Sequence, residues 1–160
     1  MSIVNPTIEY VAELHRLRET YATVPPQSRY NVILKRLEAE EIGPTRLITV
    51  VSAVEALARS IVVHRHRPNN TEALRVYAVQ KDKAATTLIE EVLKSYGMGP
   101  ASTHFSEDTW PLFRHAVNFR NLVVHECTYL GQDKYPSLIS ASYEVLDELA
   151  SISGLTRRQA

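Results

Sequence analysis

The amino-acid sequence predicts an all-α protein, an antiparallel helix bundle, and three observations support this. Glycine is rare, with 5 in 160 residues, so few positions favour tight turns. Apolar residues recur at helical spacing over long segments. The prolines fall mostly between those segments, where they end helices or begin them.

The first predicted helix begins after Asn5, a good N-cap, with Pro6 in the first helical position. Pro25 and Pro26 end it. A second helix is predicted over residues 28–41, and Gly43-Pro44 ends that one. The first helix carries an apolar stripe formed by Ile8, Val11, Leu14, Leu17 and Tyr21.

A third helix is predicted over residues 45–66, and its wide apolar face indicates a central position in the fold. A fourth, capped by Asn70 or Thr71, is expected to continue without a break to Ser95. Residues 97–103 contain two glycines and a proline, and they are expected to form a flexible loop.

A fifth helix is predicted from Thr109 to Cys127, since Pro111 is tolerated only in a first turn. A connection containing Gly131 leads to the last helix, over residues 136–153. The pattern predicts one domain over residues 1–160, with a core of four helices and N-terminal helices over about 5–41 added to it.

Charge and cysteine content narrow the function classes. Eighteen basic residues balance 18 acidic ones, which does not support a general nucleic-acid coat protein. The single cysteine, Cys127, excludes an internal disulfide and suits a reducing cytoplasm; it is expected to pack as a small apolar side chain. The longest apolar stretches, residues 47–54 and 122–124, are too short to span a bilayer. The N-terminus lacks the features of a secretory signal.

The most informative motif is R-N-x-x-x-H, formed by Arg120, Asn121 and His125 on the fifth predicted helix. Arginine provides a permanent charge with a fork that fits phosphate. Histidine can donate or accept a proton near neutral pH. Asn121 and His125 are one helical turn apart, so the amide is expected to orient the imidazole. Arg120 and His125 differ in direction by about 140°, so they can bracket a groove where two copies of the helix meet.

This motif resembles the signature of the HEPN superfamily, and the resemblance covers about residues 45–153. It implies an endoribonuclease that acts as a homodimer, without metal or other cofactor, and that cleaves RNA by attack of the 2′-hydroxyl. His125 would be the acid or base and Arg120 would bind the phosphate. Many members have glycine after the histidine, where this chain has Glu126, whose charge would repel RNA. Such toxins are often paired with an antitoxin protein.

Other residues are candidates for supporting roles. Glu55 lies within the apolar face of the third helix, and a buried acid needs a partner, so it is expected either to orient Arg120 or to lie at an exposed flank. Arg114 would extend a positive groove for RNA. The cluster that contains His64, Arg65 and Arg67 would contact phosphates or, alternatively, compensate the dipole of a helix end. No set of histidines has the spacing of a metal site.

Two alternatives to catalysis stay open at this point. The first is a non-catalytic HEPN-like module that binds nucleotides or RNA, or that dimerises. The second is a helical adaptor in which the motif is accidental. Arg120 and His125 facing solvent would favour the enzyme, whereas the same residues sealed in a salt bridge would favour the binding module.

Overall fold

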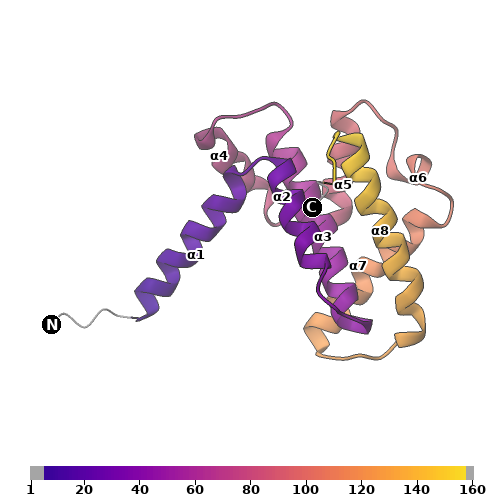
Figure 1. Ribbon diagram of the computed structural model, residues 1–160. Helices are drawn as coiled ribbons and strands as arrows, with labels where there is room; N and C mark the ends of the chain where they lie inside the picture. Colours follow the sequence, from indigo (N-terminus) through magenta and orange to yellow (C-terminus); the bar gives the residue numbers. More distant parts are fainter. Residues whose placement is uncertain (1–5, 158–160) are drawn as a thin grey trace.

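The computed structural model describes residues 6–157, with side chains from Thr7 onward, and it confirms the all-α prediction (Figure 1). Within that range there is no β-strand. A single 3₁₀ turn, η1 (Gln132–Lys134), precedes the last helix. The α-helices are α1 (Pro6–Thr23), α2 (Pro26–Leu37), α3 (Gly43–His64), α4 (Asn70–Gln80), α5 (Ala85–Ser95), α6 (Ala101–His104), α7 (Thr109–Glu126) and α8 (Tyr135–Ile152).

Helix α3 is the centre of the core, as its wide apolar face predicts. It packs against α2, α5, α7 and α8, and α7 also packs along α8 (Figure 1). Leu47, Val54 and Leu57 of α3 are fully buried. Helix α3 is also long and apolar enough to cross a membrane, contrary to the expectation from the shorter stretches. However, 61% of its most apolar window is buried inside the protein, which is equally typical of a core helix.

The predicted fourth helix is wrong as a single element, because it is divided into α4 and α5. Residues 80–83 read Gln-Lys-Asp-Lys and supply no apolar side chain for the core, so no packing maintains the helix there. The N-cap is Asn69 rather than Asn70 or Thr71, and its side chain accepts a hydrogen bond from the backbone N–H of Glu72 at 2.9 Å. The predicted loop over 97–103 contains the start of the short helix α6.

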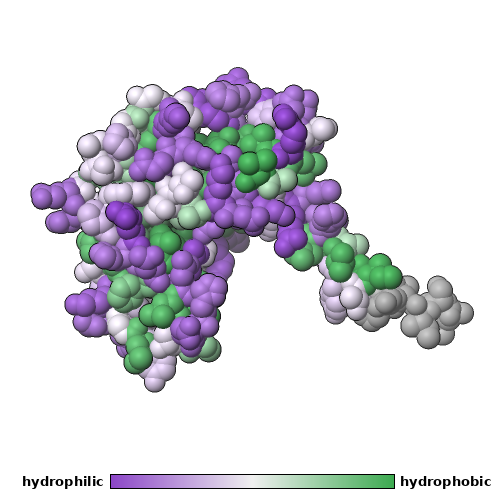
Figure 2. Space-filling model, turned by 180° about the vertical axis from the view of Figure 1, so that it is seen from behind, coloured by the Kyte–Doolittle hydropathy of each residue, from purple (hydrophilic) through white to green (hydrophobic). Residues whose placement is uncertain are grey.

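Helix α1 is present, but it does not complete the core. It projects from the body, and its last turns lie beside α4 (Figure 1). The expected apolar stripe faces solvent: Ile8 is 65% exposed and Val11 is 63% exposed. Figure 2 shows hydrophobic residues on this projecting helix. Only near its end is α1 fixed, where Ala22 is buried and its carbonyl oxygen is 2.9 Å from Nε2 of His64. The predicted cap, Asn5, lies outside the described residues.

Candidate functional site around Arg120

Helix α7 positions the motif because one of its faces is committed to the core. Trp110, Phe113, Ala116 and Val123 are buried, and α7 packs against both α8 and α3. The helix ends at Glu126 because Cys127 adopts a left-handed backbone conformation, with φ of 49°. Cys127 is exposed, so the expectation that it packs as a small apolar side chain is wrong. The motif therefore occupies the last two turns of α7, where Val123 is buried and the residues on either side of it are exposed.

Arg120 is held by three hydrogen bonds in which it is the donor. Its Nη2 donates to Oε2 of Glu55 at 3.0 Å, and its Nη1 donates to Oγ of Ser52 at 3.2 Å. Its Nε donates to Oδ1 of Asn121 at 2.9 Å. Only 16% of the Arg120 side chain is exposed. A guanidinium has five N–H donors, so these bonds leave two donors for a ligand.

Asn121 therefore acts differently from the expectation. Its amide oxygen accepts a hydrogen bond from Arg120. Among the described residues, neither Asn121 nor any other residue makes a hydrogen bond to the ring of His125, which is exposed. A neighbouring arginine competes with histidine for the same acceptor, and its charge makes the stronger hydrogen bond. The amide of Asn121 therefore helps to orient Arg120, and it does not hold the ring of His125.

Glu55 lies between two arginines. Its Oε2 accepts from Arg120, and its Oε1 accepts from Nη2 of Arg59 at 3.0 Å. The side chain of Glu55 is 22% exposed, so it lies neither in the deep core nor at a solvated flank. The contact expected between Glu55 and Arg120 is present. It joins the middle of α3 to the end of α7 through charged hydrogen bonds, which are stronger than neutral ones.

The sequence offered little indication of Ser52 and Arg59. Both lie on the same face of α3 as Glu55, at spacings of three and four residues. Ser52 also lines a groove of about 320 Å³ between α2 and α3, whose walls include Val32, Ile33 and Ile48. Helical spacing from Glu55 was the one signal that could have drawn attention to them.

The other predicted basic residues do not join this site. His64 contacts the carbonyl oxygen of Ala22, and Arg65 donates to the carbonyl oxygen of Ser95 at 3.3 Å. The guanidinium of Arg65 also lies 3.8 Å from the centre of the Tyr96 ring. These contacts attach α1 and α5 to the end of α3, which is a structural role. Arg67 and Arg114 are both exposed.

The end of α7 carries several exposed apolar side chains close in sequence to His125 and Glu126, which are exposed themselves. Leu122 and Val124 are 50% and 51% exposed, and the following loop adds Tyr129 at 65% and Leu130 at 72%. Leu122 and Val124 point to different sides of α7, since residues two apart on a helix differ in direction by about 200°. Leu122 lies on the same side as His125, three residues later.

No group of three or more His, Cys, Asp or Glu side chains in residues 7–157 is arranged to hold a metal ion. Comparison with family models, with curated protein sequences and with solved structures finds no match to this chain.

Proposed function

We propose that this protein is a metal-independent endoribonuclease of HEPN type, which acts as a homodimer in the cytoplasm. The observation that carries the proposal is Arg120, whose guanidinium is held by hydrogen bonds to three partners about one and a half turns before an exposed histidine. Rigid positioning of a charge that meets developing charge in the transition state is the main requirement of such a site. The resemblance of the R-N-x-x-x-H motif supports the proposal.

In the proposed reaction, a histidine removes the proton of an RNA 2′-hydroxyl, whose oxygen then attacks the adjacent phosphorus. The bond from phosphorus to the 5′-oxygen breaks, and a second histidine protonates that leaving oxygen. The products are a 2′,3′-cyclic phosphate and a 5′-hydroxyl. Each protomer offers one His125, so a dimer supplies both the base and the acid. Arg120 would stabilise the negative charge on the phosphorus centre through its two remaining donors.

The dimer is proposed to form through Leu122, which lies on the same side of α7 as His125, with further contacts from the exposed Tyr129 and Leu130 of the following loop. A two-fold axis there would bring two His125 side chains to one cleft, because residues near the axis of an isologous interface face their own copies. Single-stranded or loop RNA is the substrate class, since its backbone can adopt the in-line geometry. An antitoxin protein is proposed as a further partner.

The test is cleavage of single-stranded RNA in EDTA by wild type, His125→Ala and Arg120→Lys. His115→Ala is the matched control, because His115 is another exposed histidine on α7. We expect cleavage by wild type and His115→Ala, and a loss of at least a hundredfold in the two motif variants. Circular dichroism checks that all proteins are folded. Equal cleavage by His125→Ala, or products that end in a 3′-hydroxyl, would contradict this mechanism.

A non-catalytic module that binds RNA or nucleotides is the second candidate, and one observation favours it. Glu55 neutralises Arg120 through a 3.0 Å ion pair, and the side chain of Arg120 is only 16% exposed. A charge already paired gives less attraction to a phosphate. RNA binding by the wild type without any cleavage, weakened by Arg120→Lys, would support this candidate over the enzyme.

A further inference from the structure

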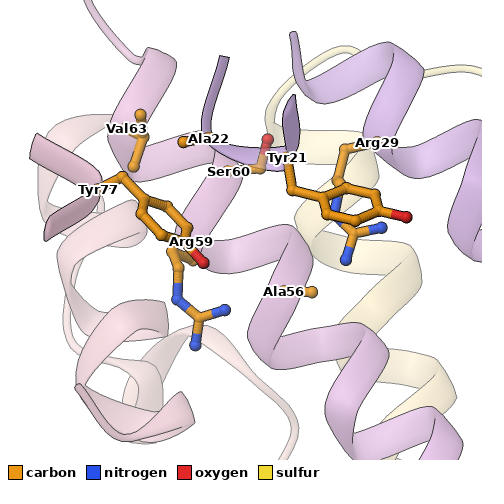
Figure 3. A pocket seen from close by; sticks show the side chains of 8 residues that line it. All are labelled: Tyr21, Ala22, Arg29, Ala56, Arg59, Ser60, Val63 and Tyr77. Carbon is orange, nitrogen blue, oxygen red and sulfur yellow. The ribbon is translucent and has the colours of Figure 1, made fainter. Parts of the chain in front are cut away.

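A second pair of arginines, Arg29 and Arg59, lines a cavity next to the motif's contacts, since Arg59 also donates to Glu55, the partner of Arg120. The cavity has a volume of about 100 Å³ and lies where α1, α2, α3 and α4 meet. Figure 3 shows Tyr21 and Arg29 on one side of Ala56, and Tyr77 and Arg59 on the other. Ser60 lies between the two pairs (Figure 3).

Two polar atoms of this cavity are buried without a partner. Nε of Arg59 and Oγ of Ser60 are inaccessible to solvent, and neither makes a hydrogen bond to any described residue. Ser60 is only 7% exposed as a whole. Buried polar atoms without partners are rare in folded proteins, and a water molecule or an ion often binds where they occur. The two atoms belong to adjacent residues of α3, and both residues line the cavity.

The cavity also has an excess of positive charge. No carboxylate of residues 7–157 lines it. Arg29 has no acidic partner in that part of the chain and is stacked on Tyr21, with its guanidinium carbon 4.6 Å from the ring centre. Arg59 shares Glu55 with Arg120, so one negative charge serves two arginines. Burial lowers the pKa of Arg29 from its usual value, and repulsion from Arg59 lowers it further. An anion between the two arginines would relieve both effects.

We propose that this cavity binds a phosphate group between Arg29, Arg59 and Ser60. Its volume of about 100 Å³ compares with about 30 Å³ per molecule in liquid water, so it has room for about three waters or one tetrahedral oxyanion. Arginine forks suit a phosphate, which accepts several hydrogen bonds at once. The hydroxyls of Ser60 and Tyr77, both of which line the cavity, supply further donors. This proposal does not rest on ribonuclease activity, although the two sites are linked through Glu55, which accepts from both Arg59 and Arg120.

Phosphate binding would also fix the position of α1. The last turn of α1 contributes Tyr21 and Ala22 to the cavity, while the rest of the helix projects from the body (Figure 1). A ligand that contacts α2, α3 and the end of α1 would hold the three together. Hydrogen exchange at the last turn of α1 would therefore slow when phosphate is bound.

The test is thermal unfolding and calorimetric titration of the full chain with inorganic phosphate, at constant ionic strength set by sodium chloride. We expect the unfolding temperature to rise with phosphate concentration by mass action. AMP is a second probe. Competition between AMP and phosphate would identify the ligand as a phosphate monoester, whereas binding of inorganic phosphate alone would identify the free ion.

Two variants and one control make the test specific. Ser60→Ala removes an unpartnered buried hydroxyl, so it should not lower the unfolding temperature without ligand, yet it should weaken phosphate binding about tenfold. Arg29→Gln should weaken binding by at least tenfold. Arg75→Gln, which changes an exposed arginine of α4 outside the cavity, should leave it unchanged. The proposal is overturned if phosphate stabilises no more than chloride, or if Ser60→Ala binds phosphate as tightly as wild type.

Discussion

The paired hydrogen bonds of Glu55 give the sharpest test of how α3 and α7 are held together. Its carboxylate accepts from Arg59 and from Arg120, each at 3.0 Å. The exposed fractions are 16% for each arginine side chain and 22% for Glu55, so solvent screens these pairs only in part. Glu55→Gln keeps the shape and one carbonyl oxygen, but it removes the charge and turns an NH₂ group toward one arginine.

The expected cost follows from these contacts. A hydrogen bond to a charged group contributes about 1.5–3 kcal/mol, and one of the two is lost outright. The bond that remains is weakened, and an arginine is left partly buried without its counter-charge. Because the group is not fully buried, we expect the free energy of unfolding to fall by about 2 kcal/mol. For a chain of this size, that lowers the unfolding temperature by about 4–8 °C.

Urea denaturation followed by circular dichroism measures this change as a shift in midpoint at constant slope. Glu126→Gln is the matched control, since it makes the same chemical change at an exposed position on the same helix as Arg120. It should alter the unfolding free energy by less than about 0.5 kcal/mol. A double-mutant cycle with Arg120→Gln should give a coupling of about 1 kcal/mol. If Glu55→Gln matched Glu126→Gln in stability, the contacts would contribute nothing and the reasoning would be refuted.

Three further predictions test the fold. Leu57→Ala should lower the unfolding free energy by about 3 kcal/mol, because Leu57 is fully buried. Leu14→Ala, at a position that is 49% exposed on α1, should lower it by no more than about 1 kcal/mol. Equal losses of the two variants in urea denaturation would contradict the exposure of α1. Burial raises the pKa of Tyr135 above its usual value of 10.0, so above pH 10 this tyrosine ionises first in the unfolded chain and stability falls. In thermal unfolding, Tyr135→Phe should lose less stability above pH 10 than wild type does. An equal loss in both proteins would argue against the raised pKa. The hydrogen bond from Arg36 lowers the pKa of Glu41 below 4.5, so the Glu41 carboxylate stabilises the fold above pH 4.5 and loses that effect as pH falls. The difference in unfolding free energy between wild type and Glu41→Gln should therefore become smaller in acid. A difference that does not change with pH would disprove the linkage.

The sequence predicted the helices well where their apolar residues repeat without interruption. The periodicity of α3 and α7 is a local pattern, so it can be recognised from neighbouring residues without knowing what packs on the apolar face. The sequence did not predict the break between α4 and α5, because the apolar residues on its two sides fit one continuous helical pattern. The polar residues 80–83 were the only local sign of that break. The sequence pattern also could not predict that the apolar side of α1 is exposed to solvent. An apolar stripe shows that a helix is amphipathic, but not whether any part of the chain covers it.

For the candidate site too, some features follow from the sequence and others depend on the tertiary structure. The sequence by itself determined the all-α class, the central α3 and the placement of Arg120 and His125 on one helix, because covalent spacing along a helix sets direction and distance. Only the tertiary structure decided which partners Arg120 has. Ser52 and Glu55 are 68 and 65 residues away along the chain, and packing of α7 on α3 brings them within hydrogen-bond distance. Tertiary packing also brings together Tyr21, Arg29, Arg59 and Tyr77, from four different helices, around one cavity. No local sequence rule relates side chains so far apart along the chain.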